Sequence, residues 1–179
     1  MKIGFIGLGN MGAALAQAVS QQADTQLLLS NHNPVKAHAL QEKMGGQLFS
    51  NGEIAEQAEV IFLGVKPHLI QSVLSGLQDQ ISQNPSAIWI SMAAGVTLNS
   101  LEEFVSADKL IRIMPNTPVA IGQGMTTYSV VNQELAPLLE QILEKSGKVQ
   151  QVPEKLIDAA TAIAGCGPAF VYQMIEALT

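Results

Sequence analysis

A glycine-rich turn next to the start of the chain constrains the fold more than any other feature. The apolar run Ile3–Ile6 leads directly into G-L-G-N-M-G (residues 7–12), and alanine-rich sequence follows. Strand, glycine turn and helix in this order form the setting in which a G-x-G-x-x-G motif binds a dinucleotide. The free N–H groups at the start of such a helix favour an anion such as a pyrophosphate. A glycine turn that only packs is the less favoured alternative.

The rest of the chain alternates apolar runs with helical patterns. Strands are expected at residues 2–6, 26–30, 47–50, 59–65, 87–91 and 110–114. Helices are expected at residues 11–22, 34–44 and from Lys66-Pro67 to about residue 81. Strands separated by helices predict right-handed crossovers and an α/β fold, here a Rossmann-type, doubly wound, mainly parallel sheet. Residues 125–131 and 148–152, on either side of a helical pattern at 134–145, are expected to extend the sheet, with an antiparallel edge as one possibility.

A domain boundary is expected near Val152-Pro153. It divides the chain into a dinucleotide-binding domain, residues 1–152, and the start of an all-helical domain, residues 153–179. The second part reads as two helices interrupted at G-C-G-P (residues 165–168). Its last helical pattern reaches the end of the chain without a capping residue, which indicates a truncated domain.

Composition narrows the class of protein. Hydrophobic residues are 47% of the chain, charged residues 13% and aromatic residues 4%, which predicts a large, mainly aliphatic core. A net charge of −6 without a basic run gives no support for nucleic-acid binding. The single Cys166 excludes an internal disulfide or a cysteine-rich metal site. Neither a signal peptide nor a membrane span is recognisable, so a soluble cytoplasmic protein without a metal is expected.

The end of the second expected strand indicates which nucleotide binds. NAD sites usually place a carboxylate there to bind the ribose hydroxyls. This chain has Ser30-Asn31-His32-Asn33 instead, with no carboxylate. Hydroxyl and amide groups tolerate a 2′-phosphate that a carboxylate would repel, so NADP(H) is favoured and NAD(H) stays possible. His32 either adds positive charge when protonated or is an ordinary exposed loop residue.

Four later segments carry a resemblance to a known family. They are FLGVKPH (62–68), SMAAGVTL (91–98), RIMPNTP (112–118) and TAIAGCGPAFVYQMIEAL (161–178). Together with the glycine turn and S-N-H-N-P they span almost the whole chain, and they resemble pyrroline-5-carboxylate reductase. The glycine turn alone also resembles the β-hydroxyacid dehydrogenases, but that family would supply a catalytic lysine after the nucleotide domain, and residues 163–179 contain no lysine.

The resemblance implies a fold, a reaction and a set of site residues. A Rossmann domain that binds NADP would be followed by a helical domain that forms a homo-oligomer, and hydride would be transferred to the C=N carbon of 1-pyrroline-5-carboxylate to give L-proline. The implied cofactor contacts are Gly7, Leu8, Gly9, Asn10, Met11, Gly12, Ser30, Asn31, Asn51, Gly64, Val65, Lys66, Pro67, Ala93, Ala94 and Gly95. The implied substrate contacts are Asn116, Gly167, Pro168 and Ala169.

Three departures from the family pattern qualify these assignments. His32 stands where the family often has Arg, Gly64 where it has Ala, and Ala164-Gly165-Cys166 where it has Ser-Gly-Ser. The first leaves the strength of 2′-phosphate binding open, whereas the other two keep the residues small and are expected to be tolerated.

No residue is assigned a catalytic role. Lys66 is less expected to be catalytic than to position the cofactor or extend into solvent. The thiol of Cys166 is less expected to be a nucleophile than a small group that permits a turn. Asn116 either faces the active site or stabilises its turn.

The resemblance also implies a further C-terminal portion, with most of the dimer interface and a substrate-contacting segment. This chain is therefore expected to bind NADP(H) but to have weak or no reductase activity. The last helix is expected to expose Phe170, Val171, Met174, Ile175 and Leu178. A module that binds the dinucleotide without catalysis stays open as an alternative.

Overall fold

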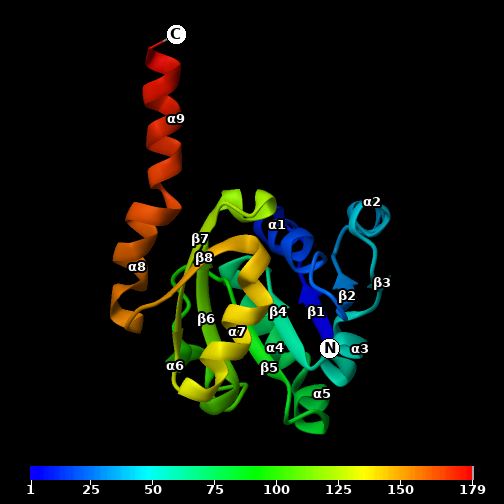
Figure 1. Cartoon of the computed structure of the whole chain (residues 1–179). Helices are drawn as coiled ribbons and strands as arrows, with labels where there is room; N and C mark the ends of the chain where they lie inside the picture. Colours follow the sequence, from blue (N-terminus) through cyan, green and yellow to red (C-terminus); the bar gives the residue numbers. More distant parts are fainter. Residues whose placement is uncertain (179) are drawn as a thin grey trace.

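An eight-stranded sheet occupies the middle of the molecule (Figure 1). The computed structural model describes residues 1–178. The strands are β1 (Lys2–Ile6), β2 (Gln26–Ser30), β3 (Gln47–Leu48), β4 (Val60–Leu63), β5 (Ile88–Ser91), β6 (Leu110–Pro115), β7 (Gly124–Val130) and β8 (Gly147–Gln151). They lie in the order β3-β2-β1-β4-β5-β6-β7-β8. The first six are parallel, β7 is antiparallel to β6, and β8 is parallel to β7. The predicted doubly wound sheet is confirmed, and the antiparallel part is β7 together with β8.

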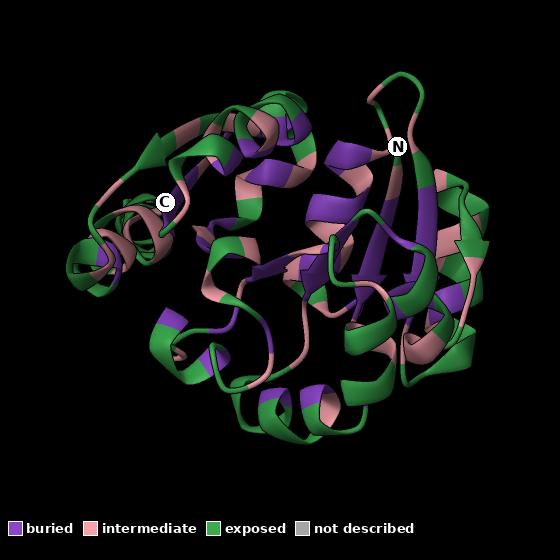
Figure 2. Ribbon diagram, turned by 90° about the horizontal axis from the view of Figure 1, so that it is seen from below, coloured by how far each residue is buried: buried purple, intermediate pink, exposed green. Residues whose placement is uncertain are grey.

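Helices cover both faces of this sheet. The helices of the chain are α1 (Asn10–Val19), α2 (Pro34–Met44), α3 (Asn51–Gln57), α4 (Ile70–Ser75), α5 (Gln78–Gln83), α6 (Leu98–Leu101), α7 (Ala136–Leu143), α8 (Ile157–Ala160) and α9 (Gly167–Ala177), of which α9 projects away from the sheet (Figure 1). One core cluster joins α1 and α7 to one face of the sheet, and a second joins α3, α4 and α6 to the other. Side chains of a strand alternate between the two, so Phe5 lies in the first cluster and Ile6 in the second. Buried residues concentrate in the central strands and in the helix faces turned toward them (Figure 2).

Two helical segments differ from the sequence-based expectation. The helix α3 was not anticipated, because its seven residues are too short for a clear periodic pattern. The single helix expected after Lys66-Pro67 is instead a 3₁₀ turn (Pro67–Leu69) followed by α4 and α5. Gly76 ends α4, and Leu77 then leaves the helical region with φ −115° and ψ 9°. Glycine has a low helix propensity, which weakens the helix at this point.

After β8 the chain forms a helical arm, residues 154–178, that projects from the body of the molecule (Figure 1). The boundary expected near Val152-Pro153 lies between β8 and the 3₁₀ turn Glu154–Leu156 that begins the arm. The interruption expected at G-C-G-P lies at Cys166, between a widened helical turn and α9. A π-helical turn, Thr161–Gly165, connects α8 to α9, and the N–H of Cys166 donates to the C=O of Thr161 at 3.0 Å.

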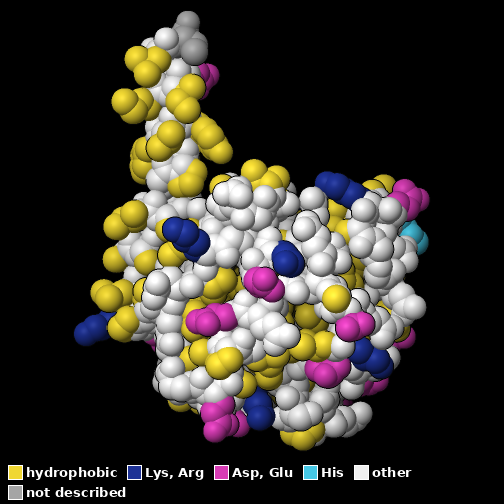
Figure 3. Space-filling view, viewed as in Figure 1, with side chains coloured by type: hydrophobic (Ala, Val, Ile, Leu, Met, Phe, Trp, Pro, Cys, Tyr) yellow, Lys and Arg dark blue, Asp and Glu magenta, His cyan; other side chains and the backbone are white. Residues whose placement is uncertain are grey.

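The projecting helix α9 exposes most of its apolar side chains. Phe170 is 65% exposed, Met174 67% and Leu178 79%, and Val171 and Ile175 are also exposed, as expected. These side chains form a nearly continuous apolar surface along the arm (Figure 3). Thr179, the last residue of the expected helical domain, lies outside the described residues. Among residues 1–178 no helix is long and apolar enough to span a membrane.

Candidate functional site

The glycine turn lies where the sheet changes its winding direction. The chain adds β2 and β3 on one side of β1 and then β4, β5 and β6 on the other side. The N–H of Gly7 donates to the C=O of Ser30 at 2.9 Å, and the N–H of Gly64 donates to the C=O of Ile6 at 2.8 Å. These two bonds bring the turns after β1, β2 and β4 together. Open α/β sheets bind their ligands at such a switch point.

Three glycines allow these turns to approach closely. Gly7 has φ +95°, a conformation that favours glycine. A Cβ atom on Gly12 would lie 2.2 Å from the carbonyl oxygen of Gly7, and one on Gly64 would lie 2.3 Å from the same oxygen. The glycine that this chain has in place of the family's alanine fits this contact, whereas an alanine at position 64 would require the two turns to shift.

Gly9 differs from its neighbours because it borders open space. A Cβ there would meet only the carbonyl oxygen of Gly64, at 3.8 Å. Its φ is −64°, so no backbone strain requires glycine at this position. The missing side chain thus leaves room for a ligand against the backbone rather than for another part of the protein.

The start of α1 presents unpaired hydrogen-bond donors. No side chain caps this helix and its first turn contains no acidic residue. Among the described residues, the N–H groups of Gly9, Asn10, Met11 and Gly12 have no hydrogen-bond partner. The N–H of Leu8 is occupied by Oδ1 of Asn31 at 3.1 Å, and the Leu8 side chain is fully buried. Four donors at the positive end of a ten-residue helix suit a pyrophosphate.

A cleft of about 700 Å³ adjoins this helix end. Its volume is in the range of sites that hold small-molecule ligands. Eight of the sequence-predicted cofactor contacts line it: Gly7, Gly9, Ser30, Asn31, Asn51, Gly64, Val65 and Lys66. The remaining lining residues are Ile6, His32, Ser50, Gly52, Leu69 and Val73. Of these, Ser50 and Gly52 could have been found from the S-x-x-E pattern that starts α3 beside Asn51.

Neutral polar groups form the far wall of the cleft. The hydroxyl of Ser30 donates to Oδ1 of Asn51 at 2.6 Å, which links the end of β2 to the start of α3. The amide of Asn31 donates to the C=O of Asn33 at 3.1 Å. Lys66 and His32 are exposed at the rim and are the basic residues among those that line the cleft. This wall carries no carboxylate to oppose a phosphate.

The α3 helix that borders the cleft has a complete capping box. The N–H of Glu53 donates to Oγ of Ser50 at 3.2 Å, and the N–H of Ser50 donates to Oε2 of Glu53 at 2.8 Å. The bond from the Ser50 backbone, followed by the bond from its hydroxyl, lowers the pKa of Glu53 below 4.5. This carboxylate is engaged in the cap rather than facing a ligand.

The other predicted cofactor contacts lie outside this cleft. Asn10, Met11 and Gly12 are in the first turn of α1, as described above. Ala93 is buried after β5, whereas Ala94 and Gly95 are exposed. Pro67 and Gly95 line a separate hollow of about 310 Å³. The structure thus brings together the contacts expected for the pyrophosphate and the adenosine, and it leaves those expected for the nicotinamide as predictions.

The predicted substrate contacts lie at the junction of the sheet and the arm. Asn116, at the end of β6, is 7% exposed. Its Oδ1 accepts from the N–H of Met125 at 2.8 Å, and its Nδ2 donates to the C=O of Ala164 at 2.9 Å. Asn116 therefore connects the end of β6 to the start of β7 and to the arm, and its contact with a substrate stays a prediction. Gly167, Pro168 and Ala169 begin α9, partly or fully exposed.

Arg112 holds the base of the arm, a role that its place in the sequence does not reveal. This β6 residue is 2% exposed and binds Oε1 of Glu154 at 3.1 Å and Oδ1 of Asp158 at 3.0 Å. The same Oε1 accepts from the N–H of Leu98 at 2.7 Å. The carboxylates that start the arm are thereby fixed to the sheet.

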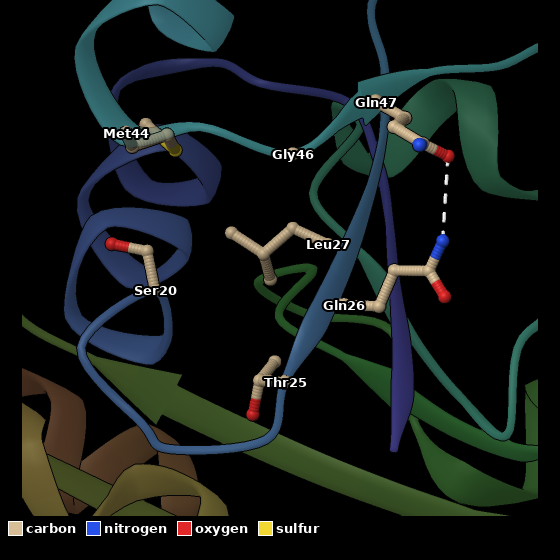
Figure 4. A pocket seen from close by; sticks show the side chains of 7 residues that line it. All are labelled: Ser20, Thr25, Gln26, Leu27, Met44, Gly46 and Gln47. Carbon is tan, nitrogen blue, oxygen red and sulfur yellow. Dashed lines mark hydrogen bonds between the residues drawn. The ribbon is translucent and has the colours of Figure 1, made fainter.

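Another hollow lies at the amino end of β2, opposite the end that borders the cleft (Figure 4). Its lining residues are Ser20, Thr25, Gln26, Leu27, Met44, Gly46 and Gln47. Gln26 donates to Gln47 across it at 3.3 Å (Figure 4). None of these side chains is ionisable, so the hollow offers neither an acid–base group nor a charge for a phosphate. Within residues 1–178 there is also no cluster of three or more His, Cys, Asp or Glu side chains that could hold a metal ion.

Comparisons with known proteins agree with this geometry. A family model described as NADP oxidoreductase, coenzyme F420-dependent, matches residues 2–95, and a model of pyrroline-5-carboxylate reductase dimerisation matches residues 154–179. A pyrroline-5-carboxylate reductase of Arabidopsis thaliana is 32% identical over 99% of this chain and 66% of its own length. Human pyrroline-5-carboxylate reductase 2 is 37% identical over 99% of this chain and 59% of its own length.

A solved structure extends the match. The Plasmodium falciparum pyrroline carboxylate reductase, crystallised with NADP bound, aligns with a TM-score of 0.86 at 33% identity and covers 99% of this chain and 67% of that one. This chain belongs to the pyrroline-5-carboxylate reductase family. It spans slightly less than two thirds of the length of the plant relative. Membership in this family decides against the β-hydroxyacid dehydrogenases, although a 3-hydroxyisobutyrate dehydrogenase of Mycobacterium tuberculosis shares the fold, with a TM-score of 0.74 at 15% identity over 89% of this chain and 57% of its own.

Proposed function

We propose that this chain binds NADP(H) in the cleft beside α1 and belongs to an enzyme that reduces 1-pyrroline-5-carboxylate to L-proline. The observation that carries the proposal is the set of four unpaired N–H groups, Gly9 to Gly12, at the edge of a 700 Å³ cleft. The polar wall at Ser30, Asn31 and Asn51 favours a nucleotide with a 2′-phosphate. The relative with NADP bound supports the same cofactor.

Each part of the cleft has a distinct task in this proposal. The N–H groups at the start of α1 bind the pyrophosphate, and Gly9 leaves room for it against the backbone. Ser30 and Asn31 bind the adenosine ribose and its 2′-phosphate, while Lys66 adds positive charge at the rim. The bound NADPH supplies the hydride for the C=N carbon.

The chain's own residues orient the reactants more than they transfer protons. A protonated cyclic imine accepts hydride readily, so alignment of the two reactants supplies most of the catalysis. Ala93, Ala94 and Gly95 after β5 are proposed to border the nicotinamide. Gly167, Pro168 and Ala169 are proposed to approach the substrate from the arm.

A titration tests the cofactor part of the proposal. Nicotinamide fluorescence is measured while the chain is added to NADPH and, separately, to NADH. We expect saturable binding with a higher affinity for NADPH. No binding of either dinucleotide would contradict the proposal. Equal affinity for the two would show that the wall without a carboxylate does not favour NADPH over NADH.

A second assay tests the reaction. Oxidation of NADPH with 1-pyrroline-5-carboxylate is followed at 340 nm for this chain and for a version extended by a C-terminal portion of the length found in its relatives. We expect turnover by the extended protein and weak or no turnover by residues 1–179. Binding without turnover by the extended protein would favour the non-catalytic dinucleotide module.

We also propose that the full protein is a homo-oligomer in the cytoplasm, and that residues 153–179 begin its dimerisation domain. The apolar surface of α9 and the match of residues 154–179 to a dimerisation model support this assembly.

A further inference from the structure

The junction between β6 and the arm contains a backbone carbonyl that its own helix cannot satisfy. In an α-helix the C=O of Ala164 would accept a hydrogen bond from the N–H of residue 168. That residue is Pro168, which has no N–H. The next N–H along the chain, that of Ala169, donates to the C=O of Cys166 instead, at 3.0 Å.

Asn116 supplies the missing donor from a different part of the fold. Its Nδ2 lies 2.9 Å from the carbonyl oxygen of Ala164, 48 residues further along the chain. The orientation of this amide is fixed by its partners, because Met125 offers only an N–H and Ala164 only a C=O. The side chain is almost completely buried, so water does not readily replace it.

The bond is formed at the widened turn that precedes α9. In that turn the N–H of Cys166 reaches back five residues to Thr161, and the hydroxyl of Thr161 donates to the C=O of Ile157 at 2.7 Å. A Cβ on Gly165 would lie 3.1 Å from Cγ2 of Thr161, so this turn is closely packed. Single π-turns of this kind are frequent at functional sites.

We infer that Asn116 is a positioning residue that replaces the hydrogen bond lost at Pro168 and thereby holds the Gly165–Ala169 segment at the carboxyl end of β6. Two contacts, one from β6 and one from the residue that follows it, then fix the arm: Arg112 holds its base and Asn116 holds its π-turn. The consequence for substrate binding rests on the proposed function. The positioning role itself does not.

The experiment is NMR-detected hydrogen exchange on residues 1–179 and on an Asn116→Asp variant. The introduced carboxylate keeps the acceptor for the Met125 N–H but loses the donor to Ala164. We expect the protection factor of the Cys166 amide to fall about tenfold, as for the loss of one hydrogen bond. Protection of the Met125 amide is expected to stay within about twofold. An unchanged Cys166 protection factor would overturn the inference.

A matched control separates this effect from a general response to the substitution. The amide of Asn132 also bridges a backbone N–H, that of Glu134 at 3.0 Å, and a backbone C=O, that of Asp108 at 3.4 Å. It does not contact the arm, so Asn132→Asp is expected to leave the Cys166 amide unchanged. An equal loss of protection in this control would contradict a specific role for Asn116.

A double-mutant cycle tests whether Asn116 compensates for the N–H that Pro168 lacks. It uses alanine variants, so it does not bury the charge that Asn116→Asp introduces. Pro168→Ala restores an N–H at position 168, so the C=O of Ala164 regains a donor within its own helix. Asn116→Ala is then expected to reduce Cys166 protection about tenfold in the natural background but less than threefold with Pro168→Ala. Equal effects in both backgrounds would show that Asn116 does not compensate for the proline.

NADPH titration of the same variants keeps this inference distinct from the proposed function. Asn116 does not line the 700 Å³ cleft, and the affinity for NADPH is expected to change by less than about twofold. If the unsubstituted chain fails to bind NADPH, the proposed cofactor is wrong and the exchange results still decide the role of Asn116.

Discussion

The glycines at the turns after β1 and β4 have different tasks, which are revealed by what an added methyl group would meet at each position. Gly9 faces the cleft, whereas Gly12 and Gly64 each lie against the carbonyl oxygen of Gly7. The sequence motif predicted the turn and its helix because strand, glycines and helix are consecutive. It could not predict the role of Gly64, since that contact depends on how closely the end of β4 approaches the turn. It also counted Leu8 among the ligand contacts, although Asn31 occupies its N–H.

The first prediction compares Gly9→Ala with Gly12→Ala. A methyl group on Gly9 enters the cleft, so NADPH affinity should fall at least tenfold while the free energy of unfolding changes by less than about 1 kcal/mol. A methyl group on Gly12 meets backbone at 2.2 Å and should lower the free energy of unfolding by about 1–3 kcal/mol. Urea denaturation and fluorescence titration measure both quantities. Equal loss of affinity without loss of stability in the two variants would refute this division.

The second prediction concerns Gly64→Ala, the residue that the family often has. The added Cβ would lie 2.3 Å from the carbonyl oxygen of Gly7, so either the turn shifts or the protein loses about 1–3 kcal/mol of stability. Thermal unfolding checks the cost, and the melting temperature should fall. A variant as stable as the natural chain would show that the two turns separate easily.

At the scale of elements, the sequence predicted strands better than short helices. Buried parallel strands such as β4 appear as continuous apolar runs, whereas α3 has seven residues and only two buried side chains, Ile54 and Ala55. The π-turn before α9 was also missed. Pro168 suggested a break, but the donor that stabilises the turn comes from Asn116, and no local pattern contains such a contact.

The third prediction tests the capping box of α3. Ser50→Ala removes the acceptor for the Glu53 N–H and should cost about 1 kcal/mol of stability. It should also weaken NADPH binding, because Ser50 and Asn51 line the cleft. Chemical denaturation and the fluorescence titration give both effects. Unchanged stability would mean that tertiary packing alone holds α3.

The pH dependence of the same element follows from the lowered pKa of Glu53. The carboxylate of Glu53 binds a proton near pH 4.5 in the unfolded chain and only at a lower pH in the folded chain. Its contribution to the free energy of unfolding is therefore complete above the pKa of the unfolded state. This contribution is lost as the pH falls through the pKa of the folded state. Glu53→Gln cannot titrate at this position and should lose less stability over that acid range. If both proteins lose stability equally, other groups account for the acid sensitivity.

At the scale of the whole molecule, the arm depends on unequal ion pairs. Asp158 is 77% exposed and Glu154 is 30% exposed, although both bind the buried Arg112. Asp158→Ala should therefore cost at most about 1 kcal/mol. Glu154→Ala should cost about 2–3 kcal/mol, because its carboxylate also accepts the Leu98 N–H and shields the guanidinium. Urea denaturation ranks the two variants, and the reverse order would contradict the prediction.

A last prediction concerns association through α9. Phe170 and Met174 lie one helical turn apart and are both exposed. Phe170→Glu and Met174→Glu should each shift the chain toward the monomer in sedimentation velocity. Val35→Glu, a similar change at a residue of α2 that is 77% exposed, should not. Equal effects of all three substitutions would indicate general charge repulsion rather than an interface.

The two edge strands of the sheet restrict how copies of this protein can associate. One end is β3, which has only two residues, and the other is β8, whose sequence G-K-V-Q-Q leaves mostly polar, exposed side chains. Neither end offers a long apolar strand on which another chain could add itself. Lateral pairing, the route by which many open sheets aggregate, is thus discouraged at both ends. Assembly through the arm, as proposed above, would therefore leave both edges of the sheet and the cleft at the switch point accessible.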